Sequence, residues 1–257
     1  MAGWGWQGGH TLVYAAAMPP PQTEAPTEST DRLRLAVFDL DGTLVDSLHI
    51  IVEAMTNACR AHGLPPLPSE QVRRIVGLPL LEAIAILLPE VEATRHGDLA
   101  QSYRTAFHDL RQGPNFDEPL YPGAVDALDA LESAGFLLGI ATGKSHRGLV
   151  KTLENHTLER RFVTLQCADH GPGKPAPHML RRALAEAGAE TVDSVMIGDT
   201  VFDMEMARAA GVPAIGVAWG YHESGELLGA GAALVVERFG EVPAAVTTLL
   251  AGVIREA

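Results

Sequence analysis

The chain of 257 residues is poor in cysteine and in basic side chains. Its two cysteines, Cys59 and Cys167, are too few for a disulfide framework and form no CxxC pair. Lys and Arg number 19 against 32 Asp and Glu, so the net charge is −13. This acidity argues against a broad nucleic-acid surface and against a polybasic membrane anchor. No window approaches the ~18 consecutive apolar residues of a membrane span. We therefore expect neither nucleic acid nor membrane as a partner.

Residues 1–30 differ in composition from the rest of the chain. They contain no Lys or Arg, so the basic start of a secretory signal is missing, and the apolar run Leu12–Met18 is short. The composition predicts a disordered tail, with a docking peptide built on Trp4 and Trp6 as the alternative. Because no targeting signal is visible, we expect a cytoplasmic protein.

From residue 33 onward, short apolar runs alternate with helical patterns. The runs predict buried strands at 33–38, 136–141, 194–197, 213–217 and 234–236. Apolar stripes of helical spacing cover residues 124–133 and 179–187. Strands that alternate with helices form a parallel sheet with helices on both faces, and the chemistry of such sheets lies at the carboxyl ends of the strands.

Residues 47–119 interrupt this alternation. Helical patterns cover 48–59, 69–76, 80–87 and 92–111, and prolines separate them. No convincing strand is found there. The sequence therefore predicts an all-helical insert between the first strand and the rest of the sheet, with residues 115–122 as the return linker.

Two pairs of carboxylates follow predicted strands. The motif D-x-D-G-T ends the first strand with Asp39 and Asp41, and G-D-T-x-x-D follows the strand 194–197 with Asp199 and Asp203. Taken singly, each pair is explained by a turn or by a helix cap. Taken together, four carboxylates at one sheet edge are poorly explained by solvated turns, and like charges this close are costly unless a cation or a proton offsets them. Mg²⁺ suits such an oxygen-rich site and also binds phosphate oxygens.

Two further signals suit a phosphate group. Thr142-Gly143 follows the strand 136–141, where a hydroxyl and backbone N–H groups at a helix start bind phosphate well. Lys174 lies in G-K-P just before a helix and is one of three lysines in the chain. It can neutralise carboxylates and hold a phosphoryl oxygen. The alternatives are a plain turn and a solvated loop lysine.

These four motifs, in this order and each at a strand end, resemble the haloacid dehalogenase superfamily, in the subgroup with a helical cap. The resemblance spans roughly residues 33–240. The segments D-G-T-L-V-D-S at 41–47 and G-L-P-L at 77–80 are similar to the phosphoglycolate phosphatase group. The resemblance implies an α/β fold in which helices sandwich a Rossmann-like parallel sheet. The core would comprise residues 31–46 and 120–257, and residues 47–119 would form the cap.

The resemblance also implies a Mg²⁺-dependent phosphatase that acts on a small phosphorylated metabolite through an aspartyl-phosphate. Asp39 would be the nucleophile, and Asp41 would protonate the leaving oxygen and then activate water. The transferring phosphoryl group would be held by Thr142, Gly143 and Lys174. Mg²⁺ would be bound by Asp39, by Asp41 through its backbone carbonyl and by Asp199, with Asp203 in support.

Within the superfamily, 2-phosphoglycolate is the expected substrate. A sugar phosphomutase, a pyrophosphatase and a non-catalytic binding protein are the alternatives. The presence of Asp41 argues against a dehalogenase, and the absence of Lys from the insert argues against Schiff-base hydrolysis of phosphonates. Either a monomer or a homodimer is expected.

The remaining candidates lie in the insert and among the histidines. Arg73 and Arg74 are close to Gly77, and we expect one of them to contact a carboxylate or phosphate of the substrate. Two solvated helix arginines are the alternative. No pair of histidines has zinc-ligand spacing with a third partner, so the sequence predicts no zinc site.

Overall fold

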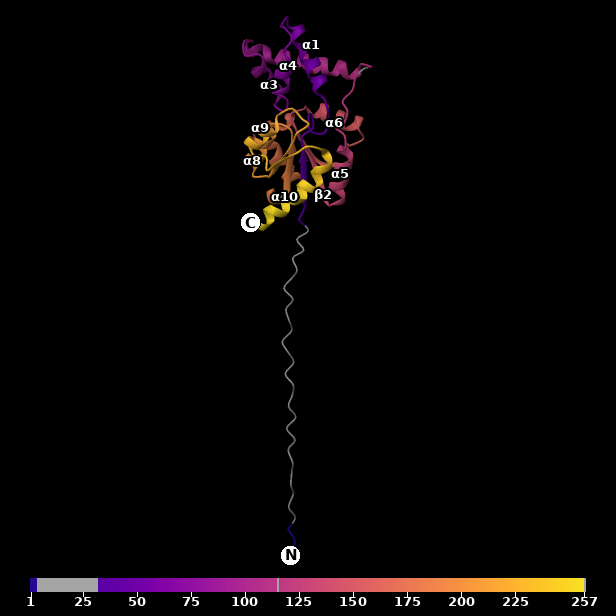
Figure 1. Ribbon diagram of the computed structural model, residues 1–257, viewed down its shortest axis with the longest axis vertical. Coiled ribbons are helices and arrows are strands. Elements are labelled where there is room, and N and C mark those ends of the chain that lie inside the picture. Colours follow the sequence, from indigo (N-terminus) through magenta and orange to yellow (C-terminus); the bar gives the residue numbers. More distant parts are fainter. Residues whose placement is uncertain (4–31, 115, 257) are drawn as a thin grey trace. The chain divides into compact units, whose positions relative to one another are not determined.

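The computed structural model describes residues 1–3, 32–114 and 116–256 (Figure 1). The chain divides into two compact units, Met1–Asp31 and Arg32–Ala257. The predicted disordered tail falls almost entirely on residues 4–31, outside the described residues, and all that follows concerns the second unit.

A parallel sheet of six strands forms the centre of this unit. The strands stand in the order β3-β2-β1-β4-β5-β6. Their bounds are β1 Arg34–Phe38, β2 Phe136–Thr142, β3 Phe162–Cys167, β4 Ser194–Gly198, β5 Ala214–Val217 and β6 Leu234–Val236. Strand order reverses at β1, and the crevice beyond the strand ends at such a point is where sheets of this kind bind ligands.

Helices cover both faces of the sheet, as predicted. Because successive side chains of a strand point to opposite faces, Phe38 packs on one side and Val37 on the other, both fully buried. The Phe38 side is covered by α5 Ala124–Ser133, α6 His146–Asn155 and α10 Val242–Glu256. The Val37 side is covered by α7 His178–Ala187, α8 Val201–Ala210 and α9 Ser224–Ala230.

Strand β3 is absent from the sequence prediction. Its segment F-V-T-L-Q-C contains two buried polar residues, Thr164 and Gln166, and so lacks the continuous apolar run that marked the other strands. Both side chains donate hydrogen bonds to a carboxylate oxygen of Glu186 in α7, over 2.7 and 2.6 Å. This distant carboxylate thus provides an acceptor for the hydroxyl of Thr164 and the amide N–H of Gln166, and local sequence carries no sign of it.

The insert is helical, as predicted. It contains α1 Leu48–Ala61, α2 Ser69–Arg73, α3 Leu80–Leu87 and α4 Ala93–Gln112, and no strand occurs between residues 48 and 114. These helices share a separate apolar cluster that includes Met55, Ile84 and Leu99. The chain enters and leaves the insert side by side, because Asp46 N donates to Pro119 O over 2.8 Å and Tyr121 N to Leu44 O over 3.0 Å. The exact domain boundaries stay a prediction.

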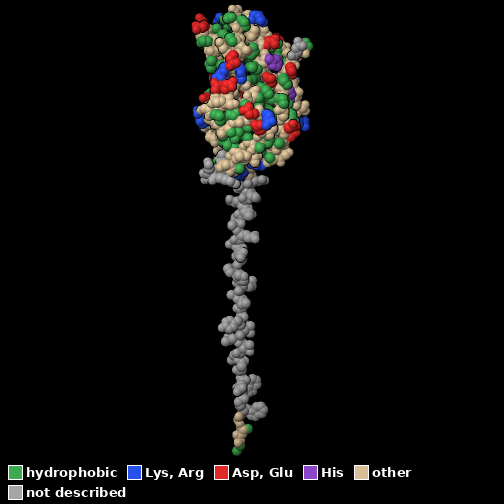
Figure 2. Space-filling view, viewed as in Figure 1, with side chains coloured by type: hydrophobic (Ala, Val, Ile, Leu, Met, Phe, Trp, Pro, Cys, Tyr) green, Lys and Arg blue, Asp and Glu red, His purple; other side chains and the backbone are tan. Residues whose placement is uncertain are grey.

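The surface of this unit mixes charges of both signs. Figure 2 shows acidic and basic side chains interspersed over the visible face, without a continuous basic stripe. Among the helices of the described residues, none combines the length and the apolar character needed to cross a bilayer.

Candidate active site

The ends of two neighbouring strands, β1 and β4, bring the predicted carboxylates together. Asp39 follows β1 directly and Asp199 follows β4, while Asp203 lies in the first turn of α8. The carboxylate oxygens of these three residues lie within 4.8 Å of one another, and all three side chains are buried. Parallel strands end at one edge of the sheet, so residues 160 positions apart in the sequence become neighbours.

Lys174 lies among these carboxylates. Its Nζ is 2.7 Å from Asp39 Oδ1 and 2.6 Å from Asp203 Oδ1, and its side chain is completely buried. The alternative of a solvated loop lysine is therefore wrong. With all groups ionised, three carboxylates and one ammonium leave 3 − 1 = 2 negative charges in excess.

This excess charge is costly in a buried site. Burial raises the pKa of Asp39 to about 7, because the favourable charge of Lys174 only partly offsets the loss of water. Burial, together with the charges of Asp39 and Asp203, likewise raises the pKa of Asp199 well above its ordinary range. A divalent cation would supply the two positive charges that the cluster lacks.

The donor atoms fit such a cation. Asp39 Oδ2 is buried and has no hydrogen-bond partner in the described part of the chain. Asp199 is held in place, because its two oxygens accept from Thr43 Oγ1 over 2.7 Å and from Tyr221 N over 2.9 Å. Carboxylate oxygens are the ligands that Mg²⁺ prefers, and outer hydrogen bonds of this kind orient metal ligands.

Gly42 keeps the space beside Asp199 free. Its φ is +87°, and a Cβ atom at this position would lie 2.2 Å from Asp199 Oδ2. The glycine of the D-x-D-G-T motif is thus required both by its backbone conformation and by the close approach of the carboxylate.

Asp203 combines the two roles considered for it. Its Oδ2 accepts from Thr200 N over 3.1 Å and from Thr200 Oγ1 over 2.7 Å, which caps α8. Its Oδ1 contacts Lys174. Asp203 therefore fixes Lys174 from the start of α8, and a direct bond from Asp203 to a metal stays a prediction.

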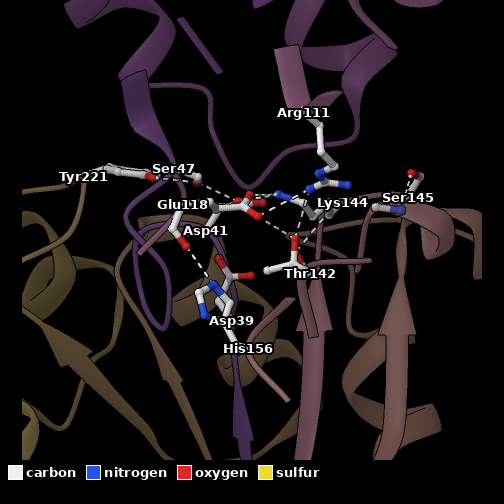
Figure 3. Close-up of polar contacts among 12 residues, drawn as sticks. Asp39, Asp41, Ser47, Arg111, Glu118, Thr142, Lys144, Ser145, His156 and Tyr221 are labelled. Atoms are coloured by element: carbon white, nitrogen blue, oxygen red, sulfur yellow. Dashed lines mark hydrogen bonds and ion pairs between the residues drawn. The ribbon is translucent and has the colours of Figure 1, made fainter. Parts of the chain in front are cut away.

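Asp41 points away from this cluster toward the insert (Figure 3). Its Oδ1 accepts from Ser47 Oγ over 2.6 Å and from Lys144 Nζ over 2.7 Å. Lys144 also donates to Glu118 Oε1 over 3.0 Å. Burial lowers the pKa of Lys144, but the charges of Asp41 and Glu118 outweigh it and the net shift is upward. Lys144 is thus a charged bridge between two carboxylates.

Sequence reasoning assigned no role to Lys144 or Glu118. Glu118 is 4% exposed although it belongs to the predicted return linker. It also lies 3.3 Å from Arg111 Nη2 of α4 and accepts from Thr152 Oγ1 of α6 over 2.9 Å. The one available signal was the position of a rare lysine directly after the T-G motif.

The phosphate-binding candidates lie where the sequence predicts. Thr142 is the last residue of β2 and is buried, and its Oγ1 accepts from Lys144 N over 3.2 Å. The insert reaches this loop, because a Cβ on Gly143 would lie 2.6 Å from Gly77 O. The Gly77 loop therefore faces the site.

Arg73 and Arg74 are engaged elsewhere. Arg73 Nη2 donates to Gly220 O over 3.1 Å, and Arg74 forms a bidentate salt bridge with Glu226 of α9 over 2.6 and 2.7 Å. Neither lines the cavity next to Asp39. The reason is that α2 packs beside the core loop at Gly220 and helix α9, whose acceptors take up both guanidinium groups. The structure thus gives no support to the expected substrate contact.

A cavity of about 960 Å³ separates the insert from the strand ends. Asp39, Asp41 and Thr142 lie at its core side. Its insert side is largely apolar and includes residues 75–81. Cations are added by α4 (Arg104, Arg111), by the loop after β2 (Lys144) and by α6 (Arg147, Lys151). The cavity can therefore hold a negatively charged molecule with one end at Asp39.

The chain matches the family described as Haloacid dehalogenase-like hydrolase over residues 36–217, which is more than half of its length. The chain belongs to this family. A Dickeya dadantii protein named "Probable phosphatase IndB" is 36% identical over 84% of this chain and 94% of its own. A phosphoglycolate phosphatase of Agrobacterium fabrum is 33% identical over 73% of this chain and 81% of its own.

Solved structures agree with this family. A hydrolase from Pseudomonas syringae superposes with a TM-score of 0.75 at 27% identity, covering 84% of this chain and 98% of that one. The superfamily and the α/β fold predicted from the motifs are therefore confirmed, and so is the class of enzyme, a phosphoric monoester hydrolase.

Proposed function

We propose that the protein is a Mg²⁺-dependent phosphatase that hydrolyses a small phosphate monoester through an aspartyl-phosphate at Asp39. The observation that carries the proposal is the state of Asp39 itself. One oxygen contacts Lys174 at 2.7 Å, and the other is buried at the end of a large cavity, with no hydrogen-bond partner among the residues that the structure describes. Such an oxygen is suited to attack phosphorus or to bind a cation.

In the first step, a carboxylate oxygen of Asp39 forms a bond to phosphorus while the bond from phosphorus to the leaving oxygen breaks. Asp41 gives a proton to that oxygen. In the second step, Asp41 takes a proton from water, the water oxygen bonds to phosphorus, and Asp39 is released with inorganic phosphate. Thr142, the Gly143 N–H and Lys174 hold the phosphoryl oxygens, because phosphoryl transfer depends mainly on positioning and charge neutralisation.

Mg²⁺, bound by Asp39, Asp199 and the backbone carbonyl of Asp41, would neutralise charge on the phosphoryl group. Three features of this chain support the assignment: the two uncompensated negative charges, the free oxygen of Asp39 and the fixed orientation of Asp199.

We propose that residues 47–119 act as a cap. The insert has its own apolar cluster. It joins the core through two connecting segments that lie side by side, residues 44–46 and 119–121, which is the arrangement expected of a hinged unit. Closure would exclude water while Asp39 attacks. The Gly77 loop, which already reaches Gly143, would lie against the leaving group.

The substrate we propose is 2-phosphoglycolate, supported by the relatives that carry this name. The volume of the cavity favours a second candidate, a phosphorylated sugar, because about 960 Å³ far exceeds what such a small acid fills. A phosphomutase or pyrophosphatase remains the alternative reaction. A non-catalytic role is disfavoured because Asp39, Asp41, Lys174 and Asp199 are all in place.

The test is phosphate release from 2-phosphoglycolate, sugar phosphates and pyrophosphate, with Mg²⁺ and with EDTA. Asp39→Asn is the control, because it keeps the shape of the side chain and removes the nucleophile. We expect hydrolysis that requires both Mg²⁺ and Asp39, fastest with phosphoglycolate. Faster turnover of a sugar phosphate would show that the substrate is a sugar phosphate instead of 2-phosphoglycolate and would leave the proposed mechanism unchanged. Full activity in Asp39→Asn would overturn the mechanism.

A further inference from the structure

Three metal-binding side chains meet beside the active site, although nothing in their sequence spacing indicated it. They are His146 at the start of α6, Cys167 at the end of β3, and His170 at the end of the short 3-10 helix η1 Ala168–His170. One ligand atom from each lies within 4.8 Å of the others. The two imidazole rings have their centroids 5.7 Å apart.

One polar atom of this cluster is not accounted for by ordinary packing. The Nδ1 atom of His170 is buried and has no hydrogen-bond partner among the residues that the structure describes. The backbone of His170 is fixed, because its carbonyl accepts from His178 Nε2 over 3.0 Å. Cys167 is fully buried, whereas His146 is exposed and gives the cluster an opening to solvent.

We propose that His146, Cys167 and His170 bind a soft divalent cation of the Zn²⁺ type, with water at the fourth position. Two imidazoles and one thiolate are the ligands that Zn²⁺ prefers. They differ in kind from the oxygen ligands at Asp39, which prefer Mg²⁺. The chain thus carries two cation sites of different chemistry, and this second proposal does not depend on the first.

Binding would change the protonation of Cys167. Burial raises the pKa of this thiol, although the backbone N–H groups of Asp169 and His170 act to lower it. In the free protein the group is therefore a thiol at neutral pH. Coordination forms a metal–sulfur bond and releases the thiol proton to solvent.

The cation would join the two loops that supply the phosphate ligands. His146 lies four residues after Thr142, and His170 lies four residues before Lys174. The loops already touch, because Ala168 N donates to Lys144 O over 3.2 Å and His146 N donates to Asp169 Oδ2 over 2.8 Å. A metal bond across this junction would hold both loops in the folded state and so stabilise the protein.

The experiment is a titration of the full chain with Cd²⁺ in excess Mg²⁺, followed by the ultraviolet charge-transfer absorption of a cadmium–thiolate bond. Carboxylates give no such band, so the Asp39 site does not contribute. Cys59→Ser is the matched control, because Cys59 is the other cysteine and is also buried. We expect a single Cd²⁺ per chain, a band retained in Cys59→Ser, and no band in Cys167→Ser.

His146→Gln keeps the test decisive if the cysteine variant folds poorly, because His146 is exposed and its loss leaves the core intact. We expect it to weaken Cd²⁺ binding by more than the roughly tenfold that loss of an outer-shell partner costs. We also expect Zn²⁺ to raise the melting temperature of the unmodified protein and not of His146→Gln. Absence of the band, a band that persists in Cys167→Ser, or unchanged affinity in His146→Gln would overturn the proposal.

Discussion

Replacement of Lys144 by methionine tests the charged bridge between Asp41 and Glu118. The Lys144 side chain is 10% exposed and lies 2.7 Å from Asp41 and 3.0 Å from Glu118. Methionine keeps most of the aliphatic stem and removes the charge. The variant thus leaves two carboxylates near the cavity without their ammonium.

The expected loss of stability follows from the burial of the partners. Removal of one member of a buried ion pair typically costs about 3–5 kcal/mol, because the other charge is left uncompensated. Glu118 keeps Arg111 at 3.3 Å, and Asp41 faces the cavity. We therefore expect a loss near the lower end, about 3 kcal/mol. The matched control is Lys151→Met on α6, whose exposed pair with Glu154 contributes about 0–1 kcal/mol.

The expected loss of activity follows from the position of Asp41. Acid–base catalysis contributes about 10²–10⁴ to the rate. Without Lys144, Asp41 keeps its hydrogen bond from Ser47 but is less restrained against rotation away from the leaving oxygen. We expect kcat to fall by about 10² and KM to change little, because Lys144 acts through Asp41. The measurements are phosphate-release kinetics and urea unfolding. An unchanged kcat, or a rise confined to KM, would refute this reasoning.

Three further predictions concern the metal site. Asp39→Asn should abolish hydrolysis. The free energy of unfolding of the metal-free variant should equal or exceed that of the unmodified protein, because a buried charge is lost, and a large drop in the urea midpoint would contradict this. In EDTA, the stability of the protein should fall from about pH 4 to about pH 7, because a pKa of about 7 for Asp39 means that the folded state binds more protons than the unfolded state over this range. Unfolding midpoints that rise with pH would be inconsistent with it. Gly42→Ala should weaken Mg²⁺ activation, because its Cβ would displace Asp199. Gly63→Ala is the control, because Gly63 also has a positive φ but no atom of the described residues other than its chain neighbours would lie within 4 Å of its Cβ, so this variant shows the effect of backbone strain alone. Equal Mg²⁺ dependence in the two variants would count against the role of Gly42.

Sequence patterns predicted those parts of the site that are set locally. Asp39, Thr142 and Asp199 each follow a strand directly, and the parallel topology alone places strand ends together. The helical insert was predictable for the same reason, since its apolar stripes and proline breaks are local signals. Five strands and their order of appearance follow from apolar runs, whereas β3 needed the distant Glu186 to satisfy its polar residues.

The parts that escaped prediction depend on where the chain goes between motifs. Glu118 meets Lys144 only because the linker after α4 returns to the core beside residues 44–46, and no pattern in residues 113–122 encodes that path. The same holds for the cluster of His146, Cys167 and His170, which forms because two loops from adjacent strands touch. Arg73 and Arg74 are the converse case: they lie close to Gly77 in sequence, but in this structure their side chains contact Gly220 and Glu226, and a contact with substrate stays a prediction.

Lys174 and Lys144 each join two carboxylates, but the two pairs differ in whether they depend on the position of the insert. Lys174 joins Asp39 to Asp203, and both of these carboxylates belong to the core. Lys144 joins Asp41 to Glu118, which lies on the segment that leaves the insert. A movement of the insert that displaces residues 116–119 would therefore disturb the surroundings of Asp41 and leave those of Asp39 unchanged. In the proposed mechanism, Asp39 would therefore stay in place when the insert moves, whereas the placement of Asp41 would depend on the linker being docked as in this structure. Two of the three lysines of the chain make such contacts, and under the proposed mechanism the position of the insert would thereby affect proton transfer at Asp41 more than the attack of Asp39 on phosphorus.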